Sequence, residues 1–172
     1  MNSYLKRNFA LGIIAAVLSP QIGVTQAASQ FTITISTPGS TISLGSELRV
    51  HVTLRNVSSD TLWLPASVSR TQAEMFYSVQ VLDKDRKPRP ETSYGHSARL
   101  HQFRGSVIEV PIAPGETMEE DTILGKQFDL SEPGVYIIQL SRPVSEKPED
   151  GVVKSNELIV TLEHFCFYCR PG

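Results

Sequence analysis

Apolar and polar residues alternate along most of the chain that follows residue 28. The alternation is cleanest where Leu48, Val50 and Val52 are separated by Arg49 and His51. A period of two places one set of side chains on one face of a β-strand and the other set on the opposite face. The same pattern recurs in segments 31–36, 48–55, 77–81, 135–140 and 158–162. These segments are predicted strands, and 135–140, which is apolar on both faces, is expected at the centre of a sheet.

Turn residues separate these segments at the spacing of a sandwich. Pro, Gly, Asn, Asp and Ser gather at positions 38–39, 44–46, 56–60, 83–85, 114–115 and 133–134. Beyond the first 28 residues, no stretch of about twelve residues has the apolar period of a helix. The pattern therefore predicts an all-β fold, an immunoglobulin-like antiparallel β-sandwich of about seven to nine strands.

Two residues with functional potential are placed by the same alternation. Trp63 lies between Leu62 and Leu64, which favours a role in core or sheet packing over an exposed tryptophan that stacks on a ligand. His51 alternates with the apolar residues of its strand, so its side chain is expected to face solvent.

One long segment, 87–105, departs from the strand pattern. It is polar and rich in Pro, Arg and His, and a connection of this length in a compact domain is either functional or mobile. We expect a solvated loop that contacts a partner, with a metal or an anion as the alternative ligand of its histidines. The candidate binding residues of this loop are Tyr94, His96, Arg99, His101 and Arg104.

The amino-terminal residues have the pattern of a secretory signal peptide. Lys6 and Arg7 precede an apolar run over 9–18, and small residues follow at Ala27 and Ala28. The run is about ten residues long, whereas a helix needs roughly 20 to span a bilayer. We therefore expect residues 1–27 to be removed and the chain to be exported, to the periplasm or the medium of a bacterium, with no membrane span left.

Length and charge narrow the function further. Removal of the signal peptide leaves about 145 residues, the size of one domain, so that 28–163 forms the sandwich and 164–172 a short tail. The 16 basic and 18 acidic residues give a net charge of -2, and nucleic-acid-binding domains carry a basic face. We expect a protein partner and no nucleic acid.

The tail contains the two cysteines of the chain, Cys166 and Cys169, just after His164. A Cys-x-x-Cys pair can act as a redox couple, but no strand–helix unit of the thioredoxin kind surrounds it. Three ligands at most fall short of a structural zinc site, which needs four. In an oxidising compartment we expect a local disulfide between the two, with an intermolecular disulfide as the alternative.

No set of residues in the sequence matches a catalytic or metal-binding motif. The serines lack the Gly-x-Ser-x-Gly context of a nucleophile. The acidic clusters at 119–121 and at Asp83 and Asp85 lack the ligand spacing of a calcium loop. We therefore expect no metal, no cofactor and no enzyme activity.

Strand and turn motifs between Gly45 and Leu162 carry a family resemblance. They are Leu54-Arg55-Asn56-Val57-Ser58, Pro114-Gly115-Glu116 and Pro133-Gly134-Val135-Tyr136. On these motifs the chain resembles bacterial secreted immunoglobulin-like domains. It is more loosely similar to the BsuPI-type proteinase inhibitor domain and to the amino-terminal domain of some fungal-type secreted metalloproteases. The resemblance implies a fold, and no functional residue of these families carries over to this chain.

Three functional hypotheses follow from the sequence. The leading one is a non-catalytic exported module that docks a protein or envelope partner through loops or a sheet edge. The second is an inhibitor of an exported peptidase that acts through the 87–105 loop. The third is a thiol–disulfide carrier that uses the tail cysteines.

Overall fold

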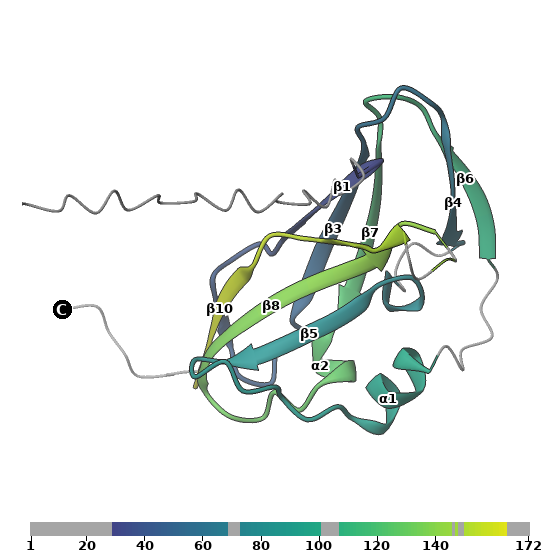
Figure 1. Cartoon of the computed structure of the whole chain (residues 1–172). Coiled ribbons are helices and arrows are strands. Elements are labelled where there is room, and N and C mark those ends of the chain that lie inside the picture. Colours follow the sequence, from purple (N-terminus) through teal and green to yellow (C-terminus); the bar gives the residue numbers. More distant parts are fainter. Residues whose placement is uncertain (1–28, 69–72, 101–106, 146, 148–149, 165–172) are drawn as a thin grey trace, which may run out of the picture.

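The computed structural model describes residues 29–68, 73–100, 107–145, 147 and 150–164 (Figure 1). The described residues form ten strands: β1 Phe31–Ser36, β2 Thr41–Ser43, β3 Arg49–Asn56, β4 Leu62–Ser67, β5 Ser78–Asp83, β6 Val107–Ile112, β7 Thr117–Ile123, β8 Gly134–Pro143, β9 Val152–Lys154 and β10 Leu158–Glu163. Three short helices join them: the 3-10 helix η1 Ala73–Met75, α1 Ser93–Arg99 and α2 Leu124–Gln127. None of the helices in these ranges is long and apolar enough to cross a membrane.

The strands form a β-sandwich, which confirms the all-β, immunoglobulin-like prediction. One sheet has the order β1-β3-β7, and the other has the order β2-β10-β8-β5 with β9 also paired to β8. In Figure 1, β5, β8 and β10 lie in front of β1, β3 and β7. Strand β8 pairs with β10 on one side and β5 on the other, so the doubly apolar segment is central, as predicted.

Strands β4 and β6 pair only with each other, antiparallel, and form a two-stranded ribbon. The ribbon stands at the right of the sandwich in Figure 1, beyond β3 and β7. The alternation along the sequence did not predict β6, because this segment carries apolar residues on both faces and a proline at position 111. The ribbon, defined as β4 plus β6, is the part of the fold that positions the candidate site.

The core lies between the two sheets and follows the alternation. Val50, Val52 and Leu54 of β3 are fully buried, as are Ile138 and Leu140 of β8. Burial of each large apolar side chain contributes roughly 1.5–3 kcal/mol, so this interface supplies most of the stabilisation. On the outer face of β3 the side chains are polar and partly exposed, which places His51 where the sequence predicted it.

The corner between the sandwich and the ribbon is held by Asn56, whose side chain is completely buried. Its Nδ2 donates to the carbonyl oxygens of Asp60 and Ile112, each at 2.8 Å. Its Oδ1 accepts from the backbone N–H of Ser58 at 2.9 Å and from the Ser58 hydroxyl. One amide thus satisfies backbone groups in the β3–β4 turn and at the end of β6, and it fixes where the ribbon leaves the sandwich.

Replacement of this amide should cost more stability than replacement of a neighbouring surface residue. Asn56→Ala removes the buried donor of the Ile112 carbonyl and one of the two donors of the Asp60 carbonyl, and we expect the free energy of unfolding to fall by about 1–3 kcal/mol. Ser59→Ala, in the exposed part of the same turn, is the control and should change it by less than about 0.5 kcal/mol. Urea unfolding measures both, and equal effects would show that the buried amide does not hold the corner.

Candidate functional site

The segment predicted to be a solvated loop contains a helix, which corrects that prediction. Helix α1 spans Ser93–Arg99, and its N-cap is Thr92, whose side-chain oxygen accepts from the Gly95 N–H at 3.1 Å. Seven residues are too few to show a helical period, so the pattern did not reveal it. His101 and Arg104 of the candidate loop lie outside the described residues, as do Cys166 and Cys169 of the tail.

The three candidate residues on α1 are engaged within the chain. The Tyr94 hydroxyl donates to Oε1 of the buried Glu74 at 2.8 Å, so this ring turns inward. Arg99 Nε donates to both carboxylate oxygens of Glu91 at 2.9 and 3.0 Å, and a further Arg99 nitrogen lies 3.0 Å from His96 Nδ1. The structure brings His96 and Arg99 together with an acid and places Tyr94 apart from them.

Helix α1 is seated on α2 through a glycine and a buried polar network. The Thr92 N–H donates to the Gln127 carbonyl at 2.8 Å, and a Cβ on Gly95 would lie 2.0 Å from that carbonyl oxygen. Gln127 Nε2 donates to the Thr122 hydroxyl, which donates to Glu74. Burial, then the bond to Glu74, raises the pKa of Tyr94 to about 12. This network ties α1, α2, η1 and β7 together under the sandwich.

The close approach of Gly95 to Gln127 makes a sharp prediction. Gly95→Ala puts a methyl group against a backbone carbonyl that cannot move freely, so α1 must shift, and we expect a loss of about 1–3 kcal/mol in unfolding free energy. Gly125→Ala is the matched control, because a Cβ there meets nothing within 4 Å. Urea unfolding and amide exchange of α1 would reveal the difference. If both variants unfold alike, the seat at Gly95 is not tight.

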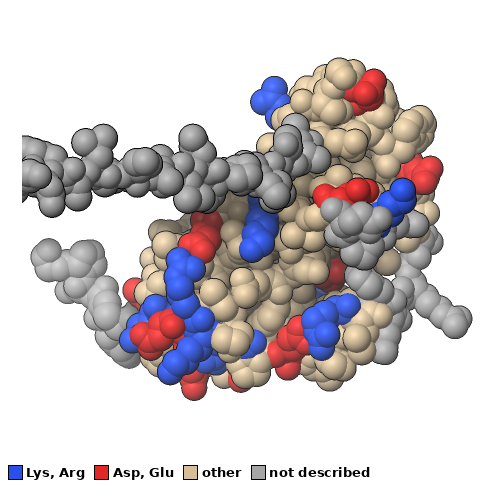
Figure 2. Space-filling model, in the orientation of Figure 1, with Lys and Arg blue, Asp and Glu red and all other residues tan. Residues whose placement is uncertain are grey.

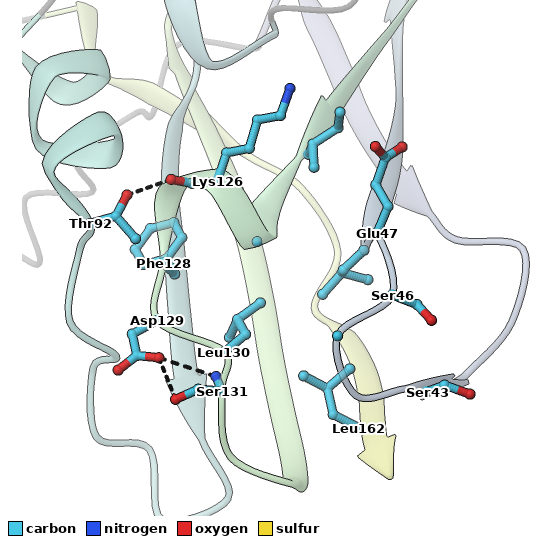
Figure 3. A pocket seen from close by; sticks show the side chains of 14 residues that line it. Ser43, Ser46, Glu47, Thr92, Lys126, Phe128, Asp129, Leu130, Ser131 and Leu162 are labelled. Atoms are coloured by element: carbon cyan, nitrogen blue, oxygen red, sulfur yellow. Dashed lines mark hydrogen bonds between the residues drawn. The ribbon is translucent and has the colours of Figure 1, made fainter. Parts of the chain in front are cut away.

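A pocket of about 520 Å³ lies between α2, the segment that follows it and the β2–β3 turn (Figure 3). Leu130 and Leu162 lie near its floor, and Lys126 and Glu47 stand on opposite walls. The acids of its rim are already used: Asp129 accepts from the Ser131 N–H and hydroxyl, and Glu47 pairs with Arg49. The carboxylates of this pocket therefore bond neighbouring residues of the chain and are not free to bind a ligand.

A second hollow, which we call the β4 groove, has a volume of about 630 Å³. It runs beside β4, and the end of β8 forms its other wall. The residues that line it are Gln30, Thr61, Leu62, Trp63, Leu64, Pro65, Phe76, Glu109, Arg142, Pro143, Val144 and Ser145. Trp63 is 63% exposed here, which corrects its prediction as a core residue. Leu62 and Leu64 flank Trp63 in the sequence and point to the other face of β4. Trp63 is exposed because no sheet covers its own face of the ribbon.

Arg142 lies at the floor of the β4 groove and is only 3% exposed. One terminal nitrogen donates to the Pro65 carbonyl at 2.8 Å and the other to the Tyr77 hydroxyl at 3.4 Å. Its guanidinium carbon lies 5.5 Å from the centre of the Phe76 ring and 5.1 Å from that of Tyr77, distances typical of cation–π contacts. The guanidinium thus joins β8 to the free side of β4.

The Tyr77 phenol has a strongly perturbed acidity. Burial raises its pKa to about 12, the positive charge of Arg142 opposes the rise, and the carboxylate of Glu120 adds to it. Because the phenol keeps its proton more tightly in the folded state, its contribution to stability is complete below the unfolded pKa of about 10 and is lost as the pH rises toward 12.

Stability should therefore depend on pH in a way that Tyr77→Phe removes. Between pH values of about 10 and 12, we expect the unfolding free energy of the native chain to fall by about 1–3 kcal/mol more than that of Tyr77→Phe. Urea unfolding across this range measures both proteins, and the variant corrects for all other titrating groups. Parallel curves would mean that the phenol is not held protonated.

The ribbon differs from the rest of the surface in its charge. Among the residues of β4 and β6, Glu109 is the one that carries a charge. The ribbon also has exposed apolar side chains, at Trp63, Val107 and Ile108. Figure 2 shows the contrast: the part over the ribbon is mostly uncharged, whereas charged side chains crowd the lower left of the molecule. In the ranges that the structure describes, no three His, Cys, Asp or Glu side chains are placed to hold a metal ion.

Neither a protein-family profile nor a curated protein sequence matches the chain. Solved structures that resemble it include a β-glucosidase from Listeria innocua in complex with gluconolactone (15% identity, TM-score 0.42, 80% of this chain and 16% of that one). A β-glucosidase from Erythrobacter marinus has 19% identity and a TM-score of 0.43, and the match covers 77% of this chain and 15% of that one. The CARDB domain of PF1109 from Pyrococcus furiosus has 12% identity and a TM-score of 0.38, and the match covers 77% of this chain and 87% of that one.

These matches correct one expectation and leave others as they were. The sequence was taken to exclude an enzyme, and the presence of β-glucosidases among the similar structures overturns that exclusion. The chain spans about a sixth of the length of the Listeria enzyme, so no activity carries over. The sandwich architecture rests on the strand pairing of the chain itself, and no family profile supports the finer resemblance to BsuPI-type or metalloprotease domains.

Proposed function

We propose that this chain is an exported binding module that docks a protein partner against the β4–β6 ribbon. The observation that carries the proposal is the exposure of apolar side chains on a surface nearly free of charge. Depletion of charge together with exposed aromatic residues distinguishes the centre of a protein interface from ordinary surface. The export component rests on the amino-terminal sequence pattern over 1–27.

The outer face of β3 and β7 shows what ordinary surface looks like in this protein. On the outer side of β3 and β7, Arg49 pairs with Asp121, and His51 Nδ1 lies 2.9 Å from Asp121 Oδ1. Glu119 continues this row of charges. The ribbon instead exposes the apolar side chains of Trp63 and Val107 on one face, where Glu109 is the one charged residue. The contrast favours the ribbon as the docking surface.

The prolines of the ribbon favour docking through its face and groove over pairing along its edges. Pro65 lies in β4 and Pro111 in β6, and proline has no N–H to donate to an added strand. The Pro65 carbonyl already accepts from Arg142. Prolines on edge strands protect a sheet against unselective strand addition. A partner therefore gains most from side-chain contacts with Trp63 and its neighbours.

Substitution on the ribbon should abolish capture of the partner, and an equally exposed residue elsewhere provides the control. Val107 is 50% exposed on the same face of the ribbon as Trp63, and Ile159 is 57% exposed on β10. In a crosslinking pull-down from envelope extract and medium of the source cells, we expect Val107→Ser and Trp63→Ser to reduce the captured partner roughly tenfold or more. Ile159→Ser should capture it as the native chain does.

Two results would contradict this proposal. Capture that survives both ribbon substitutions would place the docking surface elsewhere. If the captured protein is a peptidase whose activity falls on binding, and the ribbon variants still inhibit it, the inhibitor hypothesis for segment 87–105 replaces docking through the ribbon.

A further inference from the structure

Glu109 places an acid without a counter-charge on the surface of the ribbon. Its side chain is exposed on β6, and within the part of the chain that the structure describes it takes part in no ion pair or hydrogen bond. Other exposed acids of this protein hold an arginine: Glu91 pairs with Arg99, and Glu157 pairs with Arg86. The Glu109 carboxylate is therefore available to a cation that comes from outside the chain.

The register of the ribbon places this carboxylate beside the exposed indole. Trp63 lies opposite Pro111, and Pro65 lies opposite Glu109. Trp63 and Glu109 are thus diagonal neighbours on one face, about 7–8 Å apart at their backbones and within reach of each other's long side chains. Both residues line the β4 groove, and the indole is 63% exposed. The two prolines complete this face and add no charge to it.

The charge that the β4 groove presents to solvent is that of Glu109. Arg142 also lines the groove, but it is 3% exposed and its guanidinium donates to the Pro65 carbonyl and the Tyr77 hydroxyl. The carboxylate of the buried Glu120 helps to raise the pKa of the same phenol, so an acid lies near this cluster inside the fold. The remaining residues that line the groove are uncharged. An exposed acid in such surroundings attracts a positive ligand.

Resting on the docking function proposed above, we propose that Trp63 and Glu109 together bind an arginine side chain of the protein partner. The planar guanidinium lies over the indole, because tryptophan is the aromatic residue that attracts a cation most strongly. The N–H groups at the edge of the guanidinium donate to the Glu109 carboxylate, whose geometry they match. A lysine ammonium has the charge but not the planar face. The partner therefore carries a basic residue at the centre of its docking surface.

The experiment is an NMR titration of the whole protein with blocked tripeptide probes. Trp63 is the one tryptophan of the chain, so its indole resonance reports on this site without overlap. Acetyl-Val-Arg-Val-amide should shift that resonance and bind about fivefold more tightly than its Gln counterpart. Added salt should weaken the binding of the Arg probe alone. Equal affinity for the Arg and Gln probes, or tighter binding of a Lys probe than of the Arg probe, would overturn the proposal.

Two exposed acids provide a matched pair of variants that leave the core untouched. Glu109→Gln keeps the size of the side chain and removes its charge, so the preference for the Arg probe should fall to about twofold or less. Glu163→Gln removes an exposed acid on β10, away from the ribbon, and should keep the full preference. Trp63→Leu, followed at the Val110 amide resonance, should bind the Arg probe about threefold more weakly. A preference that survives Glu109→Gln would contradict the assigned role of this carboxylate.

The two proposals can fail separately. If Val107→Ser loses the partner but the Arg and Gln probes bind alike, docking through the ribbon stands and the arginine inference falls. If the Arg probe binds with the expected preference while Val107→Ser and Trp63→Ser still capture the partner, the site at Trp63 and Glu109 stands and the ribbon is not the docking surface.

Discussion

The position of the ribbon depends on one buried amide. Asn56 reaches across a corner where β3 ends, β4 begins and β6 returns, and it satisfies carbonyl groups on both sides. Without that side chain the buried Ile112 carbonyl would lose this donor, and an unsatisfied buried carbonyl costs a considerable part of the stability of a small domain. The ribbon can therefore hold Leu62, Ala66 and Ile112 against the core while Trp63, on its other face, stays exposed.

A second set of polar contacts lies between the sandwich, the ribbon and helix α1. Arg142 bridges β8 and β4 and stacks on Phe76, while Glu74 collects hydrogen bonds from Tyr94 and Thr122. Buried charges and acids contribute little to stability by themselves, because their desolvation offsets the contacts they gain. Their geometry is specific, and it sets the width of the groove and the seat of α1.

Residue patterns predicted the sandwich but not the site. Strands with one buried face, such as β3, leave a period of two in the sequence, because each core position must be apolar. An apolar residue such as Trp63 looks the same in the sequence whether it is buried or exposed. It is exposed because no second sheet covers its face of the ribbon. The groove unites Trp63 with Arg142, which lies in a distant strand. Helix α1 depends on the Thr92 cap and on the space at Gly95, which are tertiary contacts and leave no periodic trace.

The way in which the sandwich is closed bears on when the chain can fold. Strand β10, late in the chain, lies between β8 and the early strand β2, with which it pairs in parallel. Asn156 likewise exchanges hydrogen bonds with Ile35, 121 positions away. Contacts between such distant residues form slowly, and the β2-β10-β8-β5 sheet is incomplete while the β10 segment is still being synthesised. The two neighbours of β10, the early strand β2 and the central strand β8, therefore leave backbone hydrogen-bonding groups unpaired in a nascent chain until β10 is available.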